Sequence, residues 1–184
     1  MLALKLFCTV LLADLVSGLV HWAEDAYARP GMPLVSRIAE NNLLHHRKPR
    51  AFLANSWWES SADLLAIGAA ILALAWWQDA LTVWLLLFVL LAVNANQIHK
   101  WTHMSRREVP RIVGWLQRAR ILQTPREHAR HHTGEKNSHY CVMTNVSNPV
   151  LEKLRFWTAL EWLVEKTTGV RRRADSEYPE VSKP

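Results

Sequence analysis

Three long apolar stretches dominate the pattern of the chain. Residues 2–25 are mostly apolar, and residues 64–95 contain no Lys or Arg and form two apolar arms that meet at Gln78 and Asp79. Each arm has about 15 residues, and flanking residues extend it toward the roughly 20 that a helix needs to cross a bilayer. We therefore predict three spanning helices, over residues 2–25, 57–77 and 80–103.

Shorter segments carry helical periodicity. Residues 36–46 predict a short helix, and after Pro110 apolar residues alternate with arginines as in a helix that lies in the membrane interface. Residues 150–167 predict a final amphipathic helix, and nothing resembles a strand. The fold class is therefore an all-α integral membrane bundle with interfacial amphipathic helices. We expect one domain over residues 1–170 and a polar, loose tail over residues 171–184.

Two other interpretations of the apolar pattern are less favoured. A buried hairpin of a soluble protein would need a polar face, which neither arm has. A signal peptide over residues 2–20 would need a small-residue cleavage site, and it would not carry Asp14 in its middle.

Tryptophan and charge set the expected topology. Of the ten tryptophans, pairs at residues 57–58 and 76–77 flank one arm, as is typical of membrane interfaces. With three spans, 21 of the 22 Lys and Arg residues lie on one side and only Lys5 lies on the other. The positive-inside rule makes the first side cytoplasmic.

Composition excludes several other classes. The net charge is +6, but the cations do not gather on one polar domain, so no nucleic-acid partner is expected. Cys8 and Cys141 lie on opposite sides of the membrane in this topology, which disfavours a disulfide or a thiolate metal site.

The nine histidines all fall on the predicted cytoplasmic side. His99 and His103 are four residues apart and share a helix face, and residues 128, 131 and 132 have the same kind of spacing. Asp14, His21 and Asp25 line one stripe of the first helix, where an ionisable residue suggests function. The candidate metal ligands are His21, Asp25, His45, His46, His99, His103, His128, His131, His132 and His139.

This set is larger than one metal needs. A tetrahedral zinc takes four ligands, so up to nine imidazoles and a carboxylate are enough for two metals. Imidazole suits iron, zinc, copper and nickel. The chain has no HExxH motif of a zinc protease, and a membrane cytochrome would need only paired axial histidines.

Five stretches together resemble a known family. They are "DLVSGLVHWAEDAY", "LLHHRKP", "NQIHKWTH", "REHARHH" and "HYCVMTNVSNPVLEKLRFW". They resemble the lipid desaturases related to plasmanylethanolamine desaturase, over roughly residues 14–165. The resemblance implies an O2-dependent membrane desaturase with two iron ions and two histidine boxes. It also implies roles for His21, Asp25 and the pair His45 and His46. The candidate catalytic residues are His99, His103, His128, His131 and His132.

The expected reaction places a double bond near the head of a phospholipid chain and reduces O2 to water. The vinyl-ether bond of plasmalogens, made from plasmanylethanolamine, is the favoured product. Four alternatives remain open: a fatty-acyl phospholipid desaturase, a lipid hydroxylase, a non-catalytic lipid-linked signalling protein and a zinc-dependent membrane hydrolase.

Electrons must come from elsewhere, because the chain carries no flavin or nucleotide motif: it has no GxGxxG and no set of CxxC motifs. We expect a separate cytoplasmic carrier, a ferredoxin in a bacterium or a small b-type cytochrome in a eukaryote. The corresponding locations are the bacterial inner membrane and the endoplasmic reticulum.

Overall fold

The computed structural model describes residues 1–177, which are helical and contain no strand. The helices are α1 (Leu2–Tyr27), α2 (Ser36–Arg47), the 3-10 helix η1 (Pro49–Ala54), α3 (Trp57–Trp77), α4 (Val83–Val93), α5 (Ala95–His103), α6 (Arg111–Arg118), α7 (Pro125–His128), α8 (Ser147–Lys153), α9 (Phe156–Thr168) and the 3-10 helix η2 (Asp175–Glu177).

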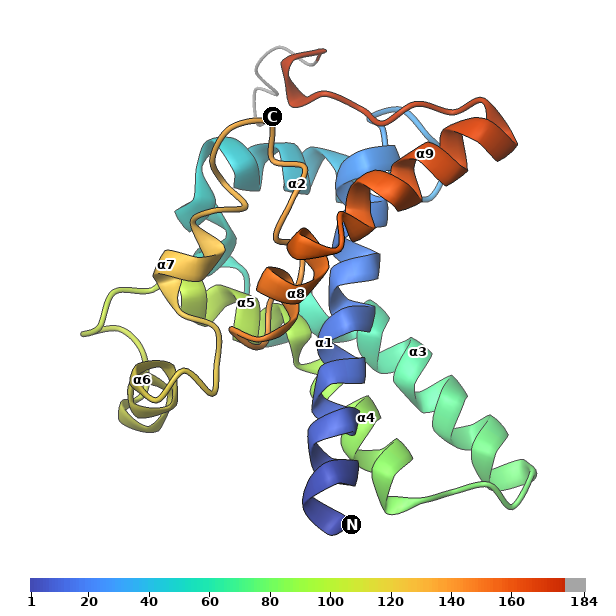
Figure 1. The fold of residues 1–184 in the computed structure, drawn as a ribbon, viewed down its shortest axis with the longest axis vertical. Helices are drawn as coiled ribbons and strands as arrows, with labels where there is room; N and C mark the ends of the chain where they lie inside the picture. The colour runs from blue at the N-terminus through green and yellow to red at the C-terminus, as the bar shows by residue number, and fades with distance from the viewer. Residues whose placement is uncertain (178–184) are drawn as a thin grey trace.

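The prediction of a membrane helical bundle is confirmed. Helices α1 and α3 are long and apolar enough to cross a membrane, and α4 with α5 forms a third span if the bent pair counts as one. Large apolar side chains such as Leu6, Ile67 and Leu90 are exposed on these helices, as expected for surfaces that face lipid. The N-terminus and the α3–α4 connection lie at one end of the molecule, and α2 and α9 lie at the other (Figure 1).

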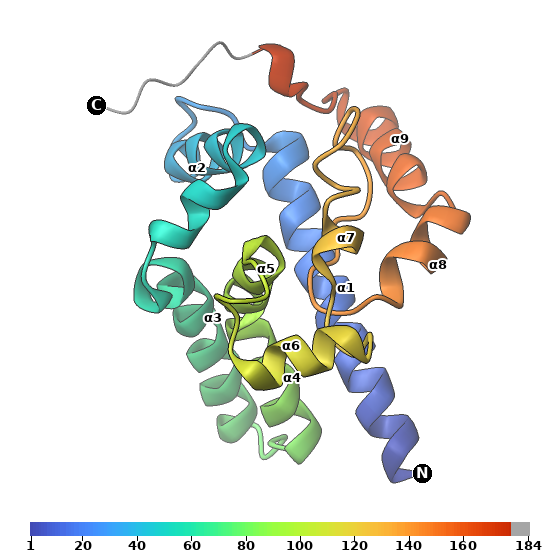
Figure 2. The ribbon, with the colours of Figure 1, turned by 90° about the vertical axis from the view of Figure 1, so that its left-hand side faces the viewer.

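The third span is not the single helix that we predicted over residues 80–103. It begins at Val83, where the side chain of Thr82 accepts a hydrogen bond from the Leu85 amide. It is then bent by 44° at Asn94, between α4 and α5. Asn94 donates to the Leu90 carbonyl and accepts from the Trp57 indole, and such local side-chain bonds compete with the helical pattern. The bend brings α5 against α7, in the middle of the molecule (Figure 2).

The final amphipathic segment is also divided. Helix α8 ends before Arg155, whose backbone is left-handed with φ of 51°, and α9 begins at Phe156. The predicted interfacial helix after Pro110 exists as α6, and it exposes Ile112 and Trp115 to the surroundings.

Asp14 holds a loop against the first span. Its carboxylate is fully buried and accepts four hydrogen bonds of 2.6–3.2 Å, from the amides of Met143 and Thr144 and the hydroxyls of Thr144 and Ser147. One turn further along α1, Gly18 has no side chain to keep Cys141 away. The contacts of Asp14 therefore attach the residue 143–147 loop to α1.

The expectation of a loose tail is wrong for residues 171–177. Arg173 is completely buried, its amide donates to the Ala26 carbonyl at 2.7 Å, and its guanidinium donates to the Ala28 carbonyl at 2.6 Å. The segment therefore packs against the end of α1. The rest of the predicted tail, residues 178–184, lies outside the described residues.

Candidate metal centre

Nine of the ten candidate ligands converge into two neighbouring groups within residues 1–177. In each group one ligand atom per residue lies within 4.8 Å of all the others. Group one contains His45, His99, His103, His128 and His132. Group two contains His21, Asp25, His46 and His131. The first span, α2, α5 and the segment from α7 onward all contribute, so no single element builds either group.

Each pair of adjacent histidines serves both groups. His45 belongs to group one and His46 to group two, and His132 and His131 divide in the same way. Neighbouring residues in a helical turn point about 100° apart, so they face different centres. The expectation that residues 128, 131 and 132 share one helix face is therefore wrong for His131. Helix α7 ends at His128, and the chain continues in turns.

The spacing of the nitrogens in group one fits a shared metal ion. The Nε2 atom of His99 lies 2.9 Å from that of His128 and 3.2 Å from that of His103. The Nε2 atom of His132 lies 3.1 Å from that of His128. Imidazole binds metals at about 2.0–2.1 Å, which places nitrogens on the same ion about 3 Å apart.

His45 gives independent support. Its side chain is buried, and neither ring nitrogen has a hydrogen-bond partner in the described part of the chain. Its ring centroid lies 4.6–4.8 Å from those of His99, His103 and His132. A buried polar atom without a partner is costly, and a metal–nitrogen bond removes that cost.

Group two surrounds one carboxylate oxygen. Oδ2 of Asp25 lies 3.1–3.2 Å from the Nε2 atoms of His21, His46 and His131. Nε2 of His46 also lies 3.2 Å from Nε2 of His131, so the four ligand atoms surround a common point. A buried group of this kind is expected where a cation binds.

The outward nitrogens of group two are all engaged. Nδ1 of His21 lies 3.0 Å from the Tyr140 carbonyl, and Nδ1 of His131 lies 2.8 Å from the Ser138 carbonyl. Nδ1 of His46 lies 2.6 Å from Oδ2 of Asp175. Such acceptors keep the proton on Nδ1 and leave Nε2 free to bind a metal.

Protonation outside the spans also suits metal binding. Burial, together with neighbouring histidines, lowers the pKa of His131 to about 4 and that of His132 to about 2. Burial and neighbouring histidines likewise hold the pKa values of His45 and His128 well below the usual range. These four rings are therefore neutral at pH 7, as a metal ligand must be.

His46 behaves differently from the other four. Burial alone would lower its pKa, but the carboxylates of Asp25 and Asp175 outweigh burial and raise it to about 9. A metal ion bound by group two would therefore take the place of a proton on this ring.

His139 lies outside both groups. Its Nδ1 atom lies 2.9 Å from the Ser138 hydroxyl, and its Nε2 atom is 3.8 Å from a carboxylate oxygen of Glu127. The backbone turns here with φ of 59°, and the amide of His139 donates to Glu152. These contacts direct the ring away from the other imidazoles.

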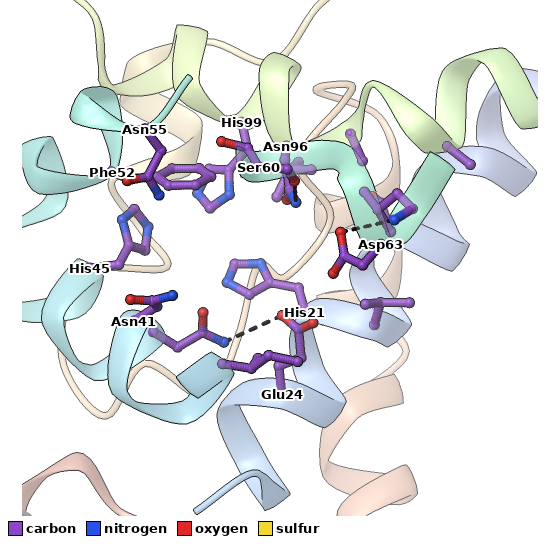
Figure 3. Close-up of a pocket in the computed structure, with 18 of the residues that line it drawn as sticks. His21, Glu24, Asn41, His45, Phe52, Asn55, Ser60, Asp63, Asn96 and His99 are labelled. Carbon is purple, nitrogen blue, oxygen red and sulfur yellow. Dashed lines mark hydrogen bonds between the residues drawn. The ribbon is translucent and has the colours of Figure 1, made fainter. Parts of the chain in front are cut away.

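A cavity of about 190 Å³ adjoins both groups. His21, His45 and His99 line it from three helices, and Figure 3 shows their rings directed toward the space between them. The apolar lining residues are Val16, Val20, Ile38, Phe52, Leu64, Ala92, Ala95 and Val142. The other polar lining residues are Ser17, Glu24, Asn41, Asn42, Asn55, Glu59, Ser60, Asp63 and Asn96.

The sequence pattern did not indicate this cavity or the contact of Asp175 with His46. The acids of the cavity lie at ordinary helical spacings, and Asp175 is 129 residues from His46 along the chain. The only nearby sequence feature that could have indicated a role for Asp175 is the run Arg171–Arg173, and we interpreted that run as part of a loose tail.

Comparisons with known proteins agree with the resemblance in the motifs. The lipid desaturase domain matches residues 10–175. A probable fatty acid desaturase of Acanthamoeba polyphaga mimivirus is 33% identical over 92% of this chain and 88% of its own. The plasmanylethanolamine desaturase of Myxococcus xanthus is 31% identical over 94% of this chain. Fatty acid desaturase 4 of Arabidopsis thaliana, a chloroplast protein, is 31% identical over 95% of this chain.

The chain spans 64% of the Myxococcus protein and 55% of the Arabidopsis protein. No solved structure matches it. The domain match extends over nine-tenths of the chain and includes all nine residues of the two groups. This protein belongs to the lipid desaturase family.

Proposed function

We propose that this protein is an O2-dependent desaturase that introduces a double bond near the head of a phospholipid chain. The favoured reaction is the formation of the vinyl-ether bond of a plasmalogen from plasmanylethanolamine. The observation that carries the proposal is a cavity, part apolar and part acidic, that ends against two groups of metal ligands.

The two groups would each hold one iron ion, since imidazole suits iron and group two adds the carboxylate of Asp25. Bound iron supplies the activation of O2 that removal of hydrogen from an unactivated C–H bond requires, which no side chain provides. His99 and His103 from α5, with His128, His131 and His132 from the second box, would act as catalytic ligands. The remaining ligands of the proposal are His21, Asp25, His45 and His46.

The lining of the cavity favours reaction on a lipid chain. The apolar wall, which includes Val16, Val20 and Leu64, would hold carbons of such a chain beside His21 and His99.

The charge of the cavity favours a headgroup that carries an amine. Glu24, Glu59 and Asp63 line it, whereas no Lys or Arg does among the described residues, although the chain has 22 such cations and only 16 acids. An ammonium is attracted to these carboxylates, and a headgroup with only negative charge is repelled. Ethanolamine has the required charge, and the name of the Myxococcus relative includes it.

The distribution of Lys and Arg supports a cytoplasmic position for the metal ligands. The protein would lie in the inner membrane of a bacterium or the endoplasmic reticulum of a eukaryote. A ferredoxin or a small b-type cytochrome would deliver the electrons from the cytoplasm.

The decisive experiment is lipid analysis of cells that express the chain and are supplied with ether lipid. Mild acid releases aldehydes from vinyl ethers, so we expect aldehydes from cells with the wild-type chain and none with His99→Ala. A new double bond in an acyl chain would instead indicate a fatty-acyl desaturase, and a new alcohol would indicate a hydroxylase. Unchanged lipids in the presence of O2 and either electron carrier would support a signalling protein.

A further inference from the structure

We propose that the segment 171–175 is a clasp that completes group two, with Asp175 as the positioning residue for His46. This inference rests on the proposed binding of iron. It assigns a role to the arginine run Arg171–Arg173 and to the acid that follows it.

The contact between Asp175 and His46 is short and directional. Oδ2 of Asp175 accepts a hydrogen bond of 2.6 Å from Nδ1 of His46, while Nε2 of the same ring lies 3.1 Å from Asp25 and 3.2 Å from His131. A proton held on Nδ1 leaves the Nε2 lone pair directed at the centre of group two. The carboxylate thus sets both the tautomer and the orientation of the ring.

Neighbouring cations stabilise the carboxylate in this position. Nζ of Lys136 lies 3.3 Å from Oδ2 of Asp175, and the guanidinium of Arg173 lies 3.5 Å from Oδ1. Lys136 follows the second histidine box by four residues and also approaches the His46 carbonyl at 3.4 Å. Asp175 therefore contacts both α2, through His46, and the chain after the second histidine box, through Lys136.

The three arginines attach the clasp to the rest of the protein. The carbonyl of Arg171 accepts a hydrogen bond of 2.9 Å from Arg29, and the guanidinium of Arg172 donates to the Lys136 carbonyl at 2.9 Å. Arg173 donates to the carbonyls of Ala26 and Ala28 at the end of α1. Helix ends leave such carbonyls without partners inside the helix, so they are ready acceptors.

Group two depends on the clasp in a way that group one does not. The rings of His21 and His131 are oriented by backbone carbonyls, which side-chain substitution leaves in place. Among the three histidines of group two, His46 alone is oriented by a side chain. Within residues 1–177, the side chain of Asp175 contacts His46, Lys136 and Arg173, and none of these belongs to group one. Loss of Asp175 should therefore weaken one iron site and spare the other.

The test compares iron binding by the full-length wild type, Asp175→Ala, Asp175→Asn and a control, Asp79→Ala. Asp79 lies exposed in the α3–α4 connection, at the end of the molecule away from α2. Iron per chain is measured by elemental analysis during titration with Fe2+, and Mössbauer spectra distinguish the two sites. Thermal unfolding of the four proteins in detergent shows whether each variant is folded.

We expect Asp175→Ala to weaken one of the two iron sites by roughly 10- to 100-fold and to leave the other site unchanged. Asp175→Asn keeps an acceptor oxygen and should restore part of the affinity, and Asp79→Ala should match the wild type. Two sites of wild-type affinity in Asp175→Ala would overturn the inference, as would equal loss of both. A wild-type protein that binds no iron would instead overturn the proposed function.

Discussion

His45 and His46 are adjacent in the sequence, yet their rings, with centroids 6.0 Å apart, face different groups of metal ligands. His131 and His132 divide between the groups in the same way, with centroids 5.3 Å apart. Each of these two pairs thus joins the two groups through a single peptide unit.

The clearest prediction concerns two histidine substitutions, one expected to reduce activity and the other to leave it unchanged. His99→Ala removes a ligand atom from the centre of group one, so iron content and desaturation should both fall, with turnover at least 100-fold lower. His139→Ala should leave both unchanged, because this ring lies outside the two groups. Aldehyde release and elemental analysis check the pair. Equal effects of the two substitutions would contradict the assignment of ligands.

Removal of the metal should show whether the protein catalyses an oxidation or a hydrolysis. A chelator should abolish turnover, and Fe2+ with O2 should restore it, because the reaction requires redox chemistry that zinc does not provide. Product formation is measured with each added metal, with and without O2. Turnover with Zn2+ in the absence of O2 would instead support the zinc-dependent hydrolase.

Asp63→Asn should change headgroup preference. The substitution removes one negative charge from the cavity wall and keeps the shape of the side chain. We expect KM for an ethanolamine lipid to rise roughly 3- to 10-fold, with a smaller change for a lipid with a glycerol headgroup. Steady-state rates on the two lipids in mixed micelles give the ratio of their KM values, and Asp79→Asn is the control. An unchanged ratio would mean that the acidic wall does not recognise the amine.

Asp14→Ala should destabilise the protein rather than alter its chemistry. It leaves two amides and two hydroxyls of the residue 143–147 loop without their buried acceptor. The loss should be about 2–4 kcal/mol of unfolding free energy, because buried donors without partners are costly. Thermal unfolding in detergent measures the effect, and the folded fraction should still bind iron. A stable variant that lacks iron would return Asp14 to a functional role.

Two glycines provide a matched pair for packing. At Gly18 a Cβ atom would lie 2.6 Å from Sγ of Cys141 and 3.1 Å from its backbone nitrogen, so Gly18→Ala should cost about 1–3 kcal/mol. At Gly114, in α6, the nearest atom would be 3.5 Å away. Gly114→Ala should be neutral or stabilising by up to about 1 kcal/mol, because alanine favours the helix. Unfolding temperatures that fall equally would disprove the close packing at Gly18.

Local pattern by itself predicted the helices and indicated most of the candidate ligands. The apolar runs indicated the spans, because a helix in a bilayer must be apolar over its whole length. The spacing of His99 and His103 predicted a shared face because it depends only on the 3.6-residue repeat. These features are encoded within a few turns of chain, and the structure confirms them for α1, α3 and α5.

Tertiary structure decided what depends on partners far along the chain. The bend at Asn94 uses a bond from Trp57, 37 residues away, and Asp14 became structural because the residue 143–147 loop returns to it. The assignment of each imidazole to one of two groups, and the contact of Asp175 with His46, follow from the same long-range packing. Local periodicity fixes the direction of a side chain relative to its own helix, and only packing determines what that side chain meets.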